Sequence, residues 1–363
     1  MKRLFFLSLF LFFFSLPLVA EETQTKILHL TMHKGCAAAF SAIAKEMNAT
    51  VTTWHVSLMP PRFMDDVTTD GGLFYNMTHR RAEAIWKKHR DFFEQFDLIC
   101  VSDTSPLSRI FLQNGFKKPL LIWICNRFDY SEERLLDEPF PDQEYYDLFA
   151  QAKKMPNVRI VGYTRFENYY AYMKGIDIGS ACLPPCVQPQ AAPILPSREL
   201  FLLPPYHNET IFMDLQAHLN GYGVPAKCTR YNGPLDMASY KGVICLPYSW
   251  SNLALFEGLA LGVPYFIPSR EFFLDLAHEP NYFLPNLGML LAHDLIDLTE
   301  WYDPSREEAF IFFDSWEDLV EKVKTTDYEA QRAKVLAYAK KFYKETMQGW
   351  KELFKEMLPG KNI

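Results

Sequence analysis

The sequence predicts an α/β fold made of two domains, each built around a parallel sheet. From residue 26 onward, short apolar and β-branched runs alternate with longer amphipathic runs, the pattern of helices that cross over between parallel strands. The chain has 363 residues, which at roughly 100 to 200 residues per domain favours two domains over one. A proline-rich stretch in the middle of the chain separates two such alternating series.

Composition is that of an ordinary globular protein. Hydrophobic residues make up 49% and charged residues 22%, so the chain can bury cores large enough to offset its conformational entropy, and a disordered or fibrous protein is excluded. The 37 Lys and Arg against 44 Asp and Glu give a net charge of -7, and the sequence contains no basic block. Because binding to phosphates needs a concentrated positive surface, we expect no nucleic-acid partner.

The first 20 residues have the features of an export signal. Lys2 and Arg3 precede an apolar run over residues 4–16, which Pro17 and Ala20 follow. This arrangement is typical of a signal peptide over residues 1–20 and predicts an exported protein, in the periplasm or, in a eukaryote, in the ER or Golgi lumen. The alternative is a retained signal-anchor, which would tether the protein to a membrane.

The first alternating series predicts an N-terminal domain over residues 25–183. Its strands are expected at apolar runs and its helices where apolar residues recur every three or four positions. A tight loop at 33–35 follows the first strand, and a longer loop with prolines and glycines covers 59–74. The predicted strands are residues 26–32, 50–55, 98–102, 119–125 and 157–163, and the predicted helices are 37–47, 76–93, 107–114 and 167–174.

A linker and a second domain follow. Five prolines between positions 183 and 196 predict a stiff linker, which we place at residues 184–197. The series after it predicts a C-terminal domain over 198–327. Apolar residues at steps of three or four then predict a long amphipathic helix over 328–358 that packs against the fold. In the C-terminal domain the predicted strands are 199–203, 226–229, 243–246 and 265–267, and the predicted helices are 211–219 and 253–261.

The most informative motif lies where a predicted strand ends at Leu246 and a hydroxyl-rich turn opens a helix. In doubly wound domains ligands bind at the carboxyl ends of the strands, and the free N–H groups of a helix start attract a diphosphate. Ser249, Ser251 and Asn252 add hydroxyl and amide donors there. Glu257, about one turn into the helix, can accept hydrogen bonds from both hydroxyls of a ribose. The structural alternative is that Ser251 or Asn252 caps the helix and that Glu257 is an exposed helical residue.

Residues 257–267 resemble the donor-binding segment of glycosyltransferases with the GT-B fold, in which two Rossmann-like domains face each other across a cleft. In that segment a Glu is followed by small or apolar residues, Gly, one further residue, Pro and an apolar strand, as here from Glu257 onward. The run at 313–319 is similar to the segment that these enzymes place before a C-terminal helix returning to the first domain. The resemblance implies this fold, a nucleotide-sugar donor, and a ribose-binding role for Glu257.

Two departures from the family pattern bear on the reaction. Many retaining members carry another glutamate eight positions before the ribose-binding one, where this chain has Ser249. The His-Cys-Gly-Trp signature of many inverting plant-type members is also absent from the sequence. The resemblance therefore leaves open whether the configuration of the sugar is retained or inverted.

Cations and a base complete the predicted site. The leaving diphosphate needs positive charge, and Arg165 and Arg230 are candidates because each lies at the end of a predicted strand. His33 follows the first strand on a glycine loop, where inverting GT-B enzymes often place the base that takes the acceptor proton. Asp103 and Asp129 also follow strands and are candidates for the base or its orienting partner. The structural alternatives are solvated arginines, a helix-capping histidine, and aspartates that cap a helix or pair locally.

These features predict a glycosyltransferase that moves a sugar from a nucleotide-sugar donor to a hydroxyl of a glycan, lipid or protein acceptor. Neither a metal nor a cofactor is implied, because the sequence has no clustered carboxylates or histidine pairs at metal-binding spacing. Two alternatives stay open. An exported solute-binding protein would also have two α/β domains around a cleft, and a catalytically silent relative would explain Ser249 where a glutamate often stands.

Overall fold

The computed structural model describes residues 24–55, 77–103, 105–129, 143–205, 213–279, 282 and 287–361. The predicted export signal or signal-anchor over residues 1–20 and the predicted loop over 59–74 lie outside these ranges. The helices predicted at 76–93 and 211–219 begin outside them as well.

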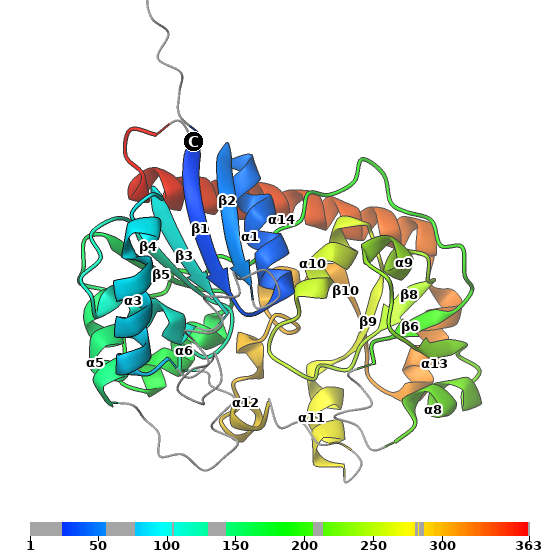
Figure 1. Ribbon diagram of the computed structural model, residues 1–363. Helices are drawn as coiled ribbons and strands as arrows, with labels where there is room; N and C mark the ends of the chain where they lie inside the picture. Colours follow the sequence, from blue (N-terminus) through cyan, green and yellow to red (C-terminus); the bar gives the residue numbers. More distant parts are fainter. Residues whose placement is uncertain are drawn as a thin grey trace, which may run out of the picture.

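Two parallel sheets of five strands form the centres of two domains (Figure 1). The first sheet contains β1 (Thr25–Thr31), β2 (Ala49–His55), β3 (Leu98–Ser102), β4 (Leu120–Ile124) and β5 (Val158–Gly162); the second contains β6 (Phe201–Leu203), β7 (Ala226–Cys228), β8 (Gly242–Ile244), β9 (Tyr265–Pro268) and β10 (Phe310–Phe313). Their orders are β2-β1-β3-β4-β5 and β10-β9-β8-β6-β7, with every pair parallel. Numbered within its own sheet, each has the order 2-1-3-4-5 of a doubly wound domain. The predicted α/β fold class is confirmed.

Helices cover both faces of the first sheet, which explains why every residue of β3 is buried. Leu98 and Cys100 face α1 (Lys34–Glu46) and the end of the C-terminal helix, whereas Ile99 and Val101 face α3 (His79–Phe93), α4 (Arg109–Leu112) and α5 (Gln143–Ala152). The helical elements of this domain are α1 (Lys34–Glu46), α3 (His79–Phe93), η1 (Ser105–Ser108), α4 (Arg109–Leu112), α5 (Gln143–Ala152) and α6 (Arg165–Met173).

The second domain carries more short helices than the sequence indicated. Its helical elements are α8 (Leu215–Gly221), α9 (Pro234–Ala238), α10 (Leu253–Ala260), α11 (Arg270–His278), α12 (Gly288–Ala292), η3 (Ile296–Leu298), η4 (Pro304–Ala309) and α13 (Trp316–Thr325). Of these, only α8 and α10 correspond to predicted helices. Elements of at most ten residues show too few repeats of an apolar residue for periodicity to reveal them reliably.

Two predicted elements differ from the structure, and two further observed elements, α5 and β10, are not among the predicted ones. The tight loop expected at 33–35 is the cap and first turn of α1, because the side chain of His33 accepts a hydrogen bond from the N–H of Gly35. The helix expected at 107–114 is divided into η1 and α4. Strand β10, absent from the prediction, pairs with β9 at the edge of the second sheet, and its four apolar residues are too few to distinguish a strand from a helix by pattern.

The C-terminal helix α14 (Tyr328–Met357) connects the two domains, and Figure 1 shows it running from the second domain (orange) to the first (red). The ring of Tyr328 lies 6.2 Å from that of Phe201 in β6, while Trp350, near the other end, lies 5.3 Å from Trp123 in β4. The predicted return of this helix to the first domain is confirmed. Within the described ranges, no helix is both long and apolar enough to cross a membrane.

Candidate functional site

A cleft of about 460 Å³ lies between the two domains, at the carboxyl ends of both sets of strands. This edge is where doubly wound domains bind ligands, and the volume is within the roughly 300 to 1,000 Å³ of small-molecule sites. From the first domain the cleft is lined by His33, Gly35, Cys36, Asp103, Cys125, Asn126, Arg127 and Tyr163. The lining residues of the second domain include Tyr231, Tyr248, Ser249, Trp250, Ser251, Asn252, Leu253 and Glu257.

The first turns of α1 and α10 meet across this cleft. A Cβ atom on Gly35 would lie 2.5 Å from Cδ1 of Leu253 and 2.9 Å from Cε1 of His33, closer than carbon atoms can approach without a shift. A methyl group at position 35 would therefore force the side chains of Leu253 and His33 to shift. Because helix starts carry unpaired N–H groups and a positive dipole end, the cleft favours an anionic group.

The loop before α10 is held from within its own domain. The Oδ1 of Asn252 accepts a hydrogen bond from the N–H of Ala254 at 2.9 Å, so this residue is the N-cap of α10. Its own N–H donates to the buried carboxyl group of Glu300, and the carbonyl of Ser249 accepts from the indole of Trp301 at 2.8 Å. The capping role considered for Asn252 is therefore its observed role, while the side chains of Ser249 and Ser251 border the cleft.

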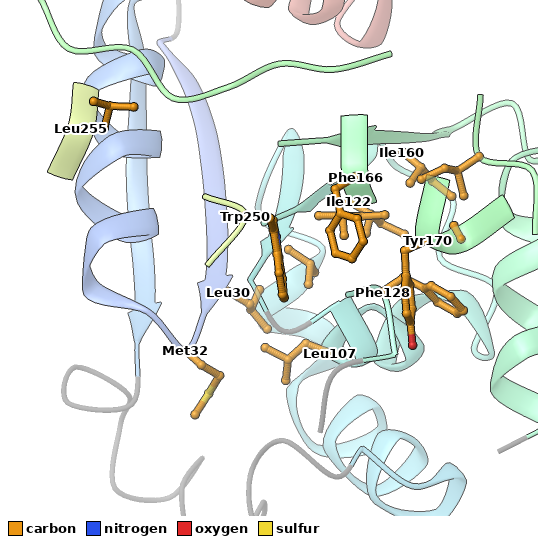
Figure 2. Packing of buried hydrophobic residues seen from close by; sticks show 14 of the residues in the cluster. Leu30, Met32, Leu107, Ile122, Phe128, Ile160, Phe166, Tyr170, Trp250 and Leu255 are labelled. Atoms are coloured by element: carbon orange, nitrogen blue, oxygen red, sulfur yellow. The ribbon is translucent and has the colours of Figure 1, made fainter. Parts of the chain in front are cut away.

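Trp250 fixes the same loop to the first domain. Its side chain is 7% exposed, its Nε1 donates to Oε1 of Glu167 at 2.9 Å, and its ring centre lies 4.7 Å from that of Phe166. Figure 2 shows Trp250 beside Phe166, within the cluster formed by first-domain residues such as Ile122. The loop is thus part of the contact between the domains as well as a wall of the cleft.

Two buried acids support this loop. Burial raises the pKa of Glu167 to about 7 and that of Glu300 to about 8. Arg306 opposes the shift of Glu300, but its NH1 lies 3.7 Å from Oε2, and the desolvation of a fully buried carboxyl group outweighs that attraction. Glu300 therefore binds its proton more tightly than an exposed glutamate does.

Glu257 lies on α10 and lines the cleft, half-buried. Burial raises the pKa of Glu257 above its usual value. Its position, one turn from the start of α10, places the carboxyl group on the same wall as Ser251, as the ribose-binding hypothesis requires.

His33 lines the opposite wall as the N-cap of α1. Its Nδ1 accepts from the N–H of Gly35 at 3.2 Å, so the neutral imidazole carries its proton on Nε2 and presents a donor. A hydrogen bond with the Cys36 thiol raises the pKa of His33, burial opposes the shift, and the charge of Asp103 adds to it. In this arrangement His33 is suited to donate a hydrogen bond, and the Nδ1 lone pair that a base would use is engaged.

Asp103, directly after β3, lines the cleft beside His33. Its φ of 62° lies in the left-handed region, which non-glycine residues rarely adopt. Asp and Asn adopt this region more readily than other non-glycine residues, and Asn48 and Asp294, which do not line the cleft, adopt it too. Among the described lining residues of the first domain, Asp103 is the only carboxylate.

The structure places Asp129 away from the cleft, which contradicts its candidate role as base. Its side chain is 1% exposed, and its carboxylate accepts hydrogen bonds from the hydroxyls of Tyr146 in α5 and Tyr170 in α6, the second at 3.1 Å. After β4 the chain turns inward between these helices. Asp129 therefore stabilises the first domain.

Neither predicted cation lies in the cleft. Arg165 donates to the carbonyl of Asp297 at 2.6 Å and lies 3.4 Å from the carboxylate of Asp303, so it joins the domains beside the cleft. Arg230 is exposed outside it, although Tyr231 is one of the lining residues. The sequence gives a strand end but not the direction of its side chains, so it could not show that neither arginine lines the cleft; the donor-binding role of each stays a prediction.

Sequence reasoning missed several residues of the cleft. Arg127, three residues after β4, is the only arginine or lysine among the described lining residues. Arg127, like Arg165, follows a predicted strand, so the same criterion also identifies it as a candidate cation. Tyr231 and Tyr248 offer rings for stacking on a base, and nothing in the sequence singled them out. In the part of the chain that the structure describes, no three His, Cys, Asp or Glu residues are grouped to hold a metal ion.

Comparisons with known proteins bear on the fold. No protein-family model and no curated protein matches the chain. Among solved structures, the chain is similar to α,α-trehalose 6-phosphate synthase from Burkholderia multivorans, at 12% identity over 92% of this chain and 96% of the other, with a TM-score of 0.50. It is also similar to the glycosyltransferase SnogD from Streptomyces nogalater (10% identity, 92% and 99% covered, TM-score 0.44) and to a UDP-N-acetylglucosamine 2-epimerase (11% identity, 92% and 96%, TM-score 0.46).

At these identities the likeness is one of fold. In this molecule the likeness consists of two doubly wound domains, a cleft between the carboxyl ends of their strands, and a C-terminal helix that returns to the first domain. The chain therefore has the GT-B fold of nucleotide-sugar glycosyltransferases, as its resemblance at residues 257–267 predicted.

Proposed function

We propose that this protein binds a nucleotide-sugar in the interdomain cleft and transfers the sugar to a hydroxyl group of an acceptor. One observation carries the proposal: Glu257 from the second domain and Asp103 from the first line the same cleft from opposite sides. A donor held by one domain and an acceptor held by the other would then meet between them.

The second domain supplies the donor side. The carboxylate of Glu257 accepts hydrogen bonds from the two ribose hydroxyls. The start of α10, together with Ser251, faces the diphosphate. Tyr231 or Tyr248 stacks on the base. Arg127 reaches the diphosphate from the first domain, where its charge is most useful as the leaving group becomes more negative.

The first domain supplies the acceptor side. The acceptor oxygen forms a bond to the anomeric carbon as the bond from that carbon to the diphosphate breaks, and the acceptor proton passes to the carboxylate of Asp103. The Nε2–H of His33 donates a hydrogen bond that orients the acceptor. The electron pair of the broken bond stays on the nucleoside diphosphate, beside Arg127.

Ligand-induced stabilisation tests the donor site. A panel of nucleoside diphosphates and free sugars is added to the protein and to Glu257→Gln, with Glu271→Gln, an exposed glutamate in α11, as the matched control. We expect one or more diphosphates to raise the melting temperature. Glu257→Gln should weaken that binding about tenfold, because one charge-assisted hydrogen bond is lost, and Glu271→Gln should leave it unchanged.

Two results would contradict the proposal. Stabilisation by free sugars alone, unchanged in Glu257→Gln, would indicate a solute-binding protein. Equal nucleotide binding by the protein and by Glu257→Gln would place the ribose away from α10 and remove the basis of the donor site.

A further inference from the structure

Two cysteines border the cleft on the side of the first domain. Cys36 lies in the first turn of α1, and Cys125 directly follows β4. Both are free thiols. Cys36 is 2% exposed, whereas Cys125 is half-buried and is therefore the one that a molecule in the cleft reaches more easily. Neither has a part in the proposed function.

The packing of α1 on β4 brings the two sulfur atoms together. Cys36 and Phe40 are four positions apart and share one face of α1. Trp123 and Cys125 are two positions apart and point to the same face of the first sheet. The rings of Phe40 and Trp123 lie 6.3 Å apart. Four helical residues and two strand residues both advance about 6 to 7 Å, so Cys36 and Cys125 face each other one step nearer the cleft.

The hydrogen bond between these thiols prepares them to react. Donation from the Cys125 thiol lowers the pKa of Cys36, and a hydrogen bond with His33 adds to this effect against the opposing effect of burial. Burial, together with the same thiol–thiol bond, raises the pKa of Cys125. Elsewhere in the first domain, burial raises the pKa of Cys182 and of Cys186 to about 12. Cys36 is therefore suited to take a proton from Cys125 and so to activate it.

We propose that Cys36 and Cys125 form a redox-active pair, which a hydroperoxide entering the cleft oxidises to a disulfide. The sulfur of Cys125 attacks one peroxide oxygen as its proton passes to Cys36. The O–O bond breaks, and hydroxide leaves and becomes water with the proton that Cys36 had released, so that Cys125 is a sulfenic acid. The sulfur of Cys36 then attacks that of Cys125, the S–O bond breaks, and a second water leaves with the proton of Cys36. Two electrons have passed from the thiols to the peroxide.

The disulfide changes the surroundings of His33. The Cys36 thiol hydrogen-bonds to His33 and raises its pKa, and a disulfide sulfur has neither the proton nor the charge of that thiol. Oxidation therefore lowers the pKa of His33 toward its usual value, while the smaller contribution of Asp103 remains. An effect of this change on acceptor binding rests on the proposed function; the disulfide itself does not.

Peptide mapping after treatment with hydrogen peroxide tests the pair, with the remaining thiols alkylated before digestion. We expect a loss of two free thiols, a cross-link between the peptides that hold Cys36 and Cys125, and its reversal by dithiothreitol. Cys36→Ala should stop at a sulfenic acid on Cys125 that dimedone labels, because the second thiol is missing. Cys125→Ala should leave the buried Cys36 largely unlabelled.

A matched control and two further measurements complete the test. Cys228→Ser changes a half-buried cysteine in β7 that does not line the cleft, and it should form the same cross-link as the unmodified protein. Titration by NMR should show a lower pKa of His33 in the oxidised protein, and urea denaturation shows that the oxidised protein was folded. No cross-link between Cys36 and Cys125 in the folded protein, or a cross-link of either to another cysteine, would overturn the proposal. No nucleotide is present, so the outcome is independent of donor binding in the cleft.

Discussion

The indole Nε1 of Trp250 lies 2.9 Å from Oε1 of Glu167, and this hydrogen bond joins a loop of the second domain to α6 of the first. Glu167 is 0% exposed, and its other oxygen accepts from the N–H of Thr164 at 2.7 Å as part of a capping box. A buried carboxyl group thus serves two purposes: it starts α6 and fixes the wall of the cleft. The residue that caps α6 in the first domain thus also holds the Trp250 loop of the second domain.

Trp250→Phe should lower the unfolding free energy by about 1 to 3 kcal/mol, because the buried Oε1 of Glu167 loses its donor. Urea denaturation measures this loss. Trp86→Phe, which shortens a half-buried indole within the first domain alone, is the matched control and should cost less. Equal losses in the two variants would mean that the interdomain hydrogen bond contributes nothing beyond packing.

Gly35→Ala should destabilise the contact between the helix starts by about 1 to 3 kcal/mol, since its methyl group would lie 2.5 Å from Leu253. Gly221→Ala, at a position with open space around its Cβ, should be neutral or stabilising. Adding Leu253→Ala to Gly35→Ala removes the opposing methyl groups. If the double variant is less stable than the sum of the two single changes predicts, the clash is not the cause.

Stability should fall as pH rises from about 5 to 8. A glutamate whose pKa is raised in the folded protein binds its proton more tightly there than in the unfolded chain. Its stabilising contribution is therefore complete below the usual pKa of 4.5. That contribution is lost as the pH rises through the folded pKa, about 7 for Glu167 and about 8 for Glu300. Glu300→Gln imitates the protonated form and keeps an acceptor for the N–H of Asn252. We expect it to flatten the loss between about pH 5 and 8, measured by urea midpoints. A slope equal to that of the unmodified protein would show that Glu300 is ionised throughout.

Asp103→Asn should reduce hydrolysis of a bound nucleotide-sugar, with water as the acceptor, by roughly 100-fold or more, because an amide cannot take the acceptor proton. His33→Gln keeps a hydrogen-bond donor and an oxygen that can cap α1, and it should reduce the rate by a smaller factor. Initial rates for both variants test this assignment. A larger effect of His33→Gln would reverse it and make the imidazole the base.

The sequence predicted the general architecture and one wall of the cleft. Alternating runs identified most of the strands, because burial on both faces makes a parallel strand apolar throughout, as in β3. Glu257 was predicted from a motif of residues close together in the sequence. Such residues lie on the same helix start, so their relative positions follow from helix geometry alone. The sequence could not show that Asp129 and Arg165 do not line the cleft, because a position after a strand does not reveal whether the side chain turns toward the cleft or toward neighbouring elements.

By itself, the sequence determined most of the strands, the longer helices, and that a helix carrying Glu257 begins after a hydroxyl-rich turn. Only the tertiary structure decided which side chains meet: that Gly35 touches Leu253, that Trp250 reaches Glu167, and that Cys36 lies beside Cys125. The reason is physical. Hydrophobic periodicity is a property of neighbouring residues along the chain, whereas these contacts join residues more than 30 positions apart, whose distances are set only when the two sheets and α14 pack together.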